Sequence, residues 1–107
     1  MKDGYFLRFY LEPRQRLEGL PGEEWLLRLG RELGLGGASV FLASEGFGRD
    51  AVVHSERFFE LGGDTPRVVE FVVEEGQDVQ VLAKIRVSGL RAFAVRFPVC
   101  FESIGER

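Results

Sequence analysis

The sequence contains only one cysteine and one histidine, Cys100 and His54, among 107 residues. With a single cysteine, neither an intrachain disulfide nor a cysteine-based metal cluster can form. No run of 18 apolar residues occurs, so the sequence predicts no segment that spans a membrane. The first residues lack the apolar run of a signal peptide, and we expect a cytoplasmic location.

The chain also lacks a net positive charge, although it contains 14 basic residues. The formal net charge is -3 and the basic residues form no stripe, so nucleic acid is not expected as a partner. Hydrophobic residues make up 45% of the chain and charged residues 29%, a balance typical of a globular protein. The length predicts a single domain over residues 1–107. Ten phenylalanines are enough to fill its core and leave aromatic surface for an interface.

Catalytic motifs are scarce as well. No G-x-S-x-G nucleophile elbow occurs, although a triad assembled from distant residues stays open. The acid pairs Glu23-Glu24 and Glu74-Glu75 lie at expected helix starts, where negative charge stabilises a helix. We therefore expect a binding protein rather than an enzyme.

Apolar periodicity predicts four strands and two helices in the order β-α-β-β-α-β. The expected strands cover residues 5–11, 38–45, 68–74 and 91–101. The first helix is expected to start at Pro21 and end at Gly34, and the second covers 77–87 with Val79, Leu82 and Ile85 at helical spacing. Two right-handed crossovers on one antiparallel sheet predict an α+β, ferredoxin-like fold with both helices on one face.

The opposite face of this sheet is expected to be unusually aromatic. Cys100 falls in the apolar last strand, where a buried thiol is the default. A face that combines aromatic rings with charges predicts a homo-oligomer that covers it. The residues expected on this face are Phe6, Arg8, Tyr10, Phe41, Val68, Glu70, Val72 and Arg96.

The most informative short motif comes after the second expected strand. Gly46-Phe47-Gly48-Arg49 allows a sharp turn whose N–H groups lie beside a guanidinium, which favours a small anion-binding site. A strand-ending turn with a solvated arginine is the alternative. His54, downstream, is either an ordinary loop histidine or a ligand-binding, metal-binding or pH-sensing residue. Residues 50–65 form a long connection, which predicts a functional, mobile loop.

These residues resemble a known family. Gly46-Phe47-Gly48-Arg49 resembles the root of the T-loop in PII nitrogen-regulatory proteins, and Pro66-Arg67 resembles the return of that loop into the third strand. The chain is still more similar to small PII-like proteins of domain-of-unknown-function family 190, over about residues 4 to 99. That similarity rests on Tyr5, Leu7, Arg8 and Tyr10, on the stretch Leu33–Val40, and on Gly46, Phe47, Gly48, His54 and Pro66.

The resemblance implies a PII-like homotrimer of ferredoxin-like subunits that regulates a partner protein. A small anionic or nucleotide-like ligand would bind in clefts between subunits. Asp50 stands where PII proteins have glutamine, and residues 87–90 leave no room for their phosphate-binding loop, so the identity of any cofactor stays open. The site residues that the resemblance implies are Gly46, Phe47, Gly48, Arg49, His54 and Arg67.

A divalent-metal-responsive protein is the alternative function. The chain is also similar in expected fold to the trimeric cation-tolerance proteins. In that case His54, Asp50 and Glu56 would supply metal ligands. An acylphosphatase-type enzyme is disfavoured, because Glu12-Pro13-Arg14-Gln15-Arg16 does not match the phosphate loop of that family.

Overall fold

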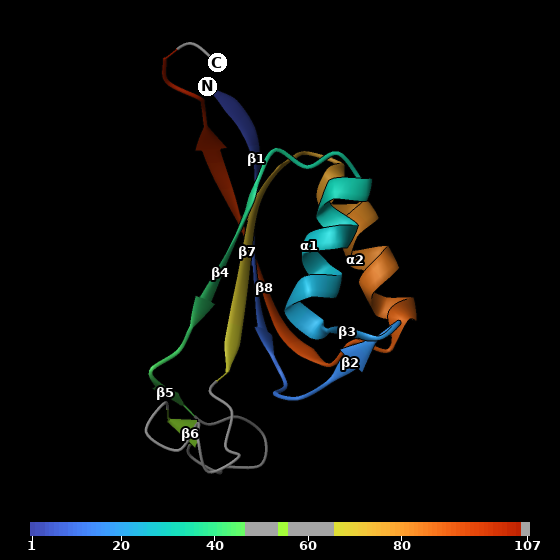
Figure 1. Ribbon diagram of the computed structural model, residues 1–107. Coiled ribbons are helices and arrows are strands. Elements are labelled where there is room, and N and C mark those ends of the chain that lie inside the picture. Colours follow the sequence, from blue (N-terminus) through green and yellow to red (C-terminus); the bar gives the residue numbers. More distant parts are fainter. Residues whose placement is uncertain (47–53, 56–65, 106–107) are drawn as a thin grey trace.

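The computed structural model describes residues 1–46, 54–55 and 66–105 (Figure 1). Within these residues a four-stranded antiparallel sheet has the strand order β4-β7-β1-β8. Its strands are β1 (Lys2–Leu11), β4 (Ala38–Leu42), β7 (Arg67–Glu74) and β8 (Ala92–Phe101). The helices α1 (Gly22–Glu32) and α2 (Gln77–Ser88) both cover one face of the sheet, so the predicted ferredoxin-like α+β fold is confirmed (Figure 1).

Two short hairpins lie outside this sheet. The first pairs β2 (Arg16–Leu17) with β3 (Leu20–Pro21), within a stretch for which the sequence indicated only a loop and a helix start. The second pairs β5 (Glu45–Gly46) with β6 (His54–Ser55). Leu42 of β4 and Leu11 of β1 both pair with Arg67, so the ends of these two strands meet the start of β7 at one end of the sheet.

The hydrophobic core lies between the sheet and the two helices. Alternate residues of β1 and β7 point toward the helices, as the two-residue period of a strand requires. Phe9 and Phe71 meet edge to face, with ring centroids 6.0 Å apart. This packing joins the two central strands beneath the helices. The buried apolar residues are Leu7, Phe9, Leu11, Leu26, Leu29, Val69, Phe71, Val73, Val81 and Ile85.

Helix α2 faces the core through Ile85, with Leu82 packed against the core, as the sequence indicated, but Val79 does not take part. Val79 is 61% exposed, whereas Val81 and Ile85 are buried. The buried position in the first turn belongs to Asp78, whose Oδ1 accepts a hydrogen bond from the Gly76 N–H at 3.0 Å. Its Oδ2 accepts another from Arg96 Nη1 at 2.9 Å. A polar residue with both oxygens bonded can replace an apolar one in the core, and this misleads a pattern based on hydrophobicity alone.

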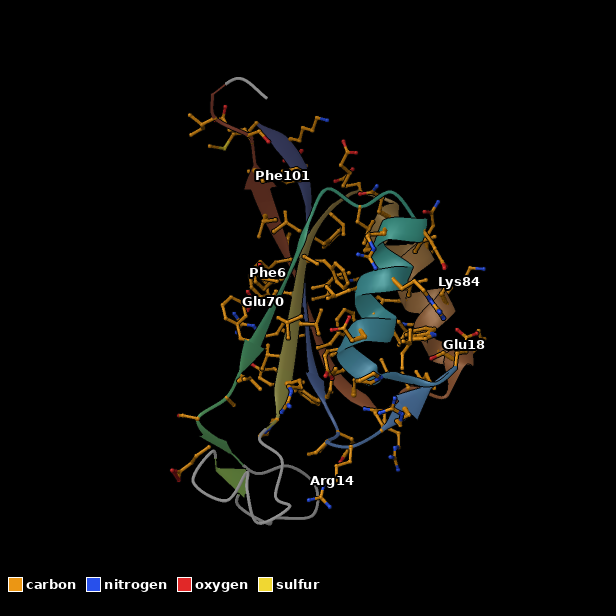
Figure 2. The ribbon with its side chains drawn as sticks, viewed as in Figure 1. Phe6, Arg14, Glu18, Glu70, Lys84 and Phe101 are labelled. Carbon is orange, nitrogen blue, oxygen red and sulfur yellow. The ribbon has the colours of Figure 1, made fainter. Side chains whose placement is uncertain are left out.

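The sheet face away from the helices, here called the open face, differs from the expected set in β8. Arg96 pairs with Leu7 and bonds to Asp78, so its expected place on the open face is wrong. The register puts Phe97 beside Phe6 and Phe93 beside Tyr10 instead. Figure 2 shows Phe6 and Glu70 on this side, opposite the helices. The open face includes Phe6, Arg8, Tyr10, Ser39, Phe41, Val68, Glu70, Val72, Phe93, Val95 and Phe97.

Cys100 is exposed, and the expectation of a buried thiol is therefore wrong. β8 is an edge strand, and its C-terminal end extends beyond the part of the sheet that the helices cover (Figure 1). The thiol donates a hydrogen bond to Asp3 Oδ1 at 3.3 Å. This hydrogen bond and the negative charge of Asp3 raise the pKa of Cys100, because both favour the protonated thiol.

Candidate functional site

The structure describes three of the six predicted site residues. Gly46 and His54 lie opposite each other across the β5–β6 hairpin, and Arg67 is the first residue of β7. Phe47, Gly48 and Arg49 lie outside the described residues, as do Asp50 and Glu56. The predicted role of the Gly-Phe-Gly-Arg turn therefore stays a prediction.

Arg67 lies on the helix side of the sheet, beside the first turn of α1. Its Nε is 3.8 Å from Glu23 Oε1, and each of the two side chains is 22% exposed. Alternation along β7 explains this placement, because Arg67 shares a face with the buried residues Val69 and Phe71. The arginine thus marks the point where the core ends and an open cavity begins.

The cavity beside Arg67 has a volume of about 310 Å³. It lies between the β1–β2 connection, the start of α1 and the start of β7. Among the described residues, three guanidinium groups and two carboxylates line it. Arginine forks match the geometry of carboxylates and phosphates, which makes this lining suitable for a small anion. The lining residues are Glu12, Pro13, Arg14, Gln15, Arg16, Pro21, Glu23 and Arg67.

Gln15 fixes the base of the hairpin that forms one wall of this cavity. Its buried amide donates to the Glu12 carbonyl at 2.9 Å and to the Arg91 carbonyl at 2.7 Å. Its Oε1 accepts from the Arg91 N–H at 2.9 Å, and its backbone carbonyl accepts from the Gly22 N–H. One side chain therefore ties the β1–β2 connection to the start of β8, and its backbone reaches α1.

Glu18 fixes the tip of the same hairpin. Its Oε2 accepts a hydrogen bond from Trp25 Nε1 at 3.1 Å and forms an ion pair with Arg28, so the tip is attached to α1. Figure 2 shows Glu18 on the helix side of the molecule and Arg14 at the end that carries the β5–β6 hairpin. Arg14 and Glu18 both have left-handed backbone angles, with φ values of 61° and 52°. Non-glycine residues rarely adopt this conformation; Glu18 does so in the turn of the hairpin and Arg14 in the connection before it.

The sequence interpretation missed most of the residues that line this cavity. Arg14 and Arg16 were noted only as part of a stretch that does not match a phosphate loop, and Glu23 only as a helix-start acid. The available signal was the run Arg14-Gln15-Arg16 between two prolines and just before a helix. Of the three predicted site residues that the structure describes, Arg67 is the one that lines the cavity.

Metal ligands do not gather in the described part of the chain. Residues 1–46, 54–55 and 66–105 contain no group of three or more histidine, cysteine or acidic side chains that could hold a metal ion. In the same ranges no helix has the length and apolar character needed to cross a membrane.

The order and pairing of the described elements define a ferredoxin-like α+β protein. The model of the DUF190 family, described as "Uncharacterized ACR", matches residues 4–95, and the chain belongs to this family, as the resemblance predicted. A UPF0166 protein of Aquifex aeolicus (strain VF5) is 34% identical over 80 residues, which are 75% of this chain and 76% of the relative.

Two solved structures share the fold at low sequence identity. A protein of Thermus thermophilus that is described as PII-like and signalling has a TM-score of 0.60 at 17% identity, with 92% of this chain and 87% of that chain covered. The CPII protein of Thiomonas intermedia K12, solved with ADP and bicarbonate, also has a TM-score of 0.60, at 16% identity, with 91% and 88% covered. These similarities confirm the PII-like architecture.

Proposed function

We propose that this chain is a non-catalytic regulatory protein of the PII-like type. It assembles as a homotrimer, binds a small anionic or nucleotide-like ligand at the clefts between subunits, and acts on a partner protein through the segment between β4 and β7. Membership of the DUF190 family supports this proposal. So does the PII-like fold that the chain shares with two solved structures, one of them containing ADP and bicarbonate.

The observation that carries the proposal is the arginine-lined cavity at the end of the sheet. Arg67 lines it, and Arg67 is also where the chain enters β7 after the β5–β6 segment. A ligand in the cavity would therefore contact the root of that segment, and ligand-dependent ordering of a loop is a common form of switch. The proposed binding residues are Gly46, Phe47, Gly48, Arg49, His54 and Arg67, together with Arg14 and Arg16 of the cavity wall.

A thermal-shift screen tests this function. The compounds are ADP, ATP, inorganic phosphate, pyrophosphate, bicarbonate, succinate and divalent cations. We expect at least one anion to raise the Tm, since a ligand at a hundredfold excess over its Kd stabilises the folded state by about 2.7 kcal/mol. Stabilisation by divalent cations alone would favour the metal-responsive alternative. If no compound raises the Tm, the ligand-binding function is wrong.

Arg67→Ala then identifies the site. Removing the guanidinium should weaken the binding of the anion by about 1.5 to 3 kcal/mol, the range for a hydrogen bond to a charged group. Arg31→Ala is the matched control, because Arg31 is exposed in the last turn of α1 and does not line the cavity. Equal affinity of the two variants would place the ligand elsewhere.

A further inference from the structure

We propose that Arg8 and Glu70 set the register in which a second copy of this chain docks on the open face. The aromatic residues of that face supply the attraction, and the ion pair among them disfavours displaced arrangements. This inference rests on the homotrimer of the proposed function and specifies how the chain selects that assembly. It depends on two observations about the described residues: the order of side chains across the sheet, and the pairing of the charges on the open face.

Polar and aromatic side chains lie in separate rows across the open face. Strand pairing places Arg8 of β1 between Glu70 of β7 and Val95 of β8. Ser39 of β4 lies on the other side of Glu70. Ser39, Glu70 and Arg8, here called the polar row, thus cross three of the four strands. The rows that flank the polar row are Phe41, Val68, Tyr10 and Phe93 on one side, and Val72, Phe6 and Phe97 on the other.

Arg8 is fixed in the polar row by neighbours from its own chain. Its Nε donates a hydrogen bond to Glu70 Oε2 at 2.7 Å, and its Nη1 donates to the Tyr10 hydroxyl at 3.4 Å. Its guanidinium carbon is 5.3 Å from the centroid of the Phe6 ring, within the range of a cation–π contact. The ion pair therefore has a defined position relative to the aromatic rings before a second copy arrives.

The charges favour a second copy of this chain as the occupant of the open face. Within the four described strands, the charged residues of this face form the ion pairs Arg8–Glu70, at 2.7 Å, and Lys2–Glu74, at 2.9 Å. The net charge of these residues is zero. A face with an excess of one charge would repel an identical copy and attract a protein of opposite charge, whereas this face does neither. Phe93, which is 69% exposed, needs an apolar cover, and an identical open face provides one.

The polar row favours one register of docking over the others. Neighbouring residues on one face of a strand are about 7 Å apart. A copy displaced by this distance would cover Arg8 and Glu70 with aromatic rings, and the pair would lose water without gaining a polar contact. Such desolvation is costly, and a polar group in an apolar interface can specify register for this reason. In the matched register, the polar rows of neighbouring copies meet.

The test is sedimentation velocity and native mass spectrometry of the full chain over a range of micromolar concentrations. The parent should give one oligomeric mass. Arg8→Met/Glu70→Leu replaces the pair by apolar side chains, so self-association should persist with more than one oligomeric mass. The matched control, Lys2→Met/Glu74→Leu, removes the other ion pair of the same face. Its side chains are 68% and 50% exposed, against 37% and 20% for Arg8 and Glu70, so the control should keep the single mass of the parent.

Two further variants keep the test decisive if the doubly apolar protein does not fold, which circular dichroism checks. Glu70→Leu alone leaves the Arg8 charge unpaired beneath the second copy, and should weaken self-association at least about tenfold. Arg8→Glu/Glu70→Arg restores an ion pair with the charges exchanged, and should recover the single mass of the parent. Failure of this exchanged pair to recover that mass, in a folded protein, would overturn the register role.

The remaining outcomes separate the register role from the homotrimer itself. A single parental mass for folded Arg8→Met/Glu70→Leu would overturn the register role and leave the homotrimer standing. A monomeric mass for the same folded variant would also overturn it, because the pair would then supply attraction rather than register. Mixed masses in the Lys2→Met/Glu74→Leu control would reduce the effect to added hydrophobicity. A monomeric parent would overturn the homotrimer and the inference together.

Discussion

Gln15 shows how a single buried side chain can position a site without touching the core. Its amide completes three hydrogen bonds, two of them to the backbone of Arg91. Arg91 lies just before β8. Its carbonyl accepts hydrogen bonds from the Gln15 amide and from the Glu12 N–H, and its N–H donates to Gln15 Oε1. Hydrophobic patterns contain no information on such a contact, because a glutamine in a polar stretch looks like any loop residue.

We predict that Gln15→Ala lowers the free energy of unfolding by about 2 to 3 kcal/mol, because it removes a partner from backbone groups of Arg91 and Glu12. Gln80→Ala is the control, since Gln80 is exposed on α2 and should change stability by less than about 0.5 kcal/mol. Urea denaturation measures the free energy of unfolding of both variants. The protein concentration is kept the same, because association between copies raises the apparent stability. Similar midpoints for the two variants would contradict the role of Gln15.

At the scale of secondary-structure elements, the sequence predicts those elements that have a clear apolar period. Strands with a period of two and the strongly amphipathic α1 lie within a few residues of their expected bounds. Periodicity fails where polar contacts decide the placement. Asp78 takes a core position that the pattern assigned to Val79, and Arg96 points toward α2 rather than to the open face. The β2–β3 hairpin was missed because its strands have only two residues each.

The central strand β1 also depends on a close approach that periodicity cannot indicate. A Cβ atom at Gly4 would lie 2.0 Å from the backbone oxygen of Val73 and 2.8 Å from the Phe101 ring. Such distances require the paired strands themselves to move, since β7 lies on one side of β1 and β8 on the other.

We therefore expect Gly4→Ala to destabilise the fold by about 1 to 3 kcal/mol, the usual range for overpacking in a tight site. Gly36→Ala is the control, because nothing lies within 4 Å of a Cβ at that position and its φ is not positive. Thermal unfolding followed by circular dichroism compares the two. A Gly4→Ala Tm equal to that of the parent would show that β1 and β7 separate easily.

At the scale of the whole molecule, the open face contains aromatic rings arranged around an ion pair. Phe6 and Phe97 stack with centroids 4.9 Å apart, and Arg8 lies 5.3 Å from the Phe6 ring centroid. The hydrogen bond from Arg8 to Tyr10 raises the pKa of Arg8 most, and the hydrogen bond to Glu70 raises it further. Arg8 therefore keeps its positive charge at every physiological pH. If a second copy covers this face, Arg8 and Glu70 are already paired with each other. Burying this pair costs less desolvation free energy than burying two unpaired charges.

We predict a homotrimer at micromolar concentration, held together through the open face. Phe93→Glu should dissociate it, because Phe93 is 69% exposed in the single chain and an unpaired carboxylate is costly to bury. Val87→Glu is the control: Val87 is 83% exposed, but it lies on α2, on the other side of the sheet. Analytical ultracentrifugation gives the masses. A monomeric parent, or dissociation by Val87→Glu alone, would show that this face is not the interface.

In the described part of the chain, the β2–β3 hairpin forms no ladder with the four-stranded sheet, yet Arg16 of β2 and Pro21 of β3 line the cavity. It is attached by side chains, at its base through Gln15 and at its tip through Glu18. Substitutions of Arg16, the cavity residue between these two anchors, are therefore expected to leave the four-stranded sheet intact. Relatives that keep the anchors but differ in this short stretch are free to diverge in ligand preference, and the same stretch is the natural place to randomise when the specificity of the scaffold is to be redesigned.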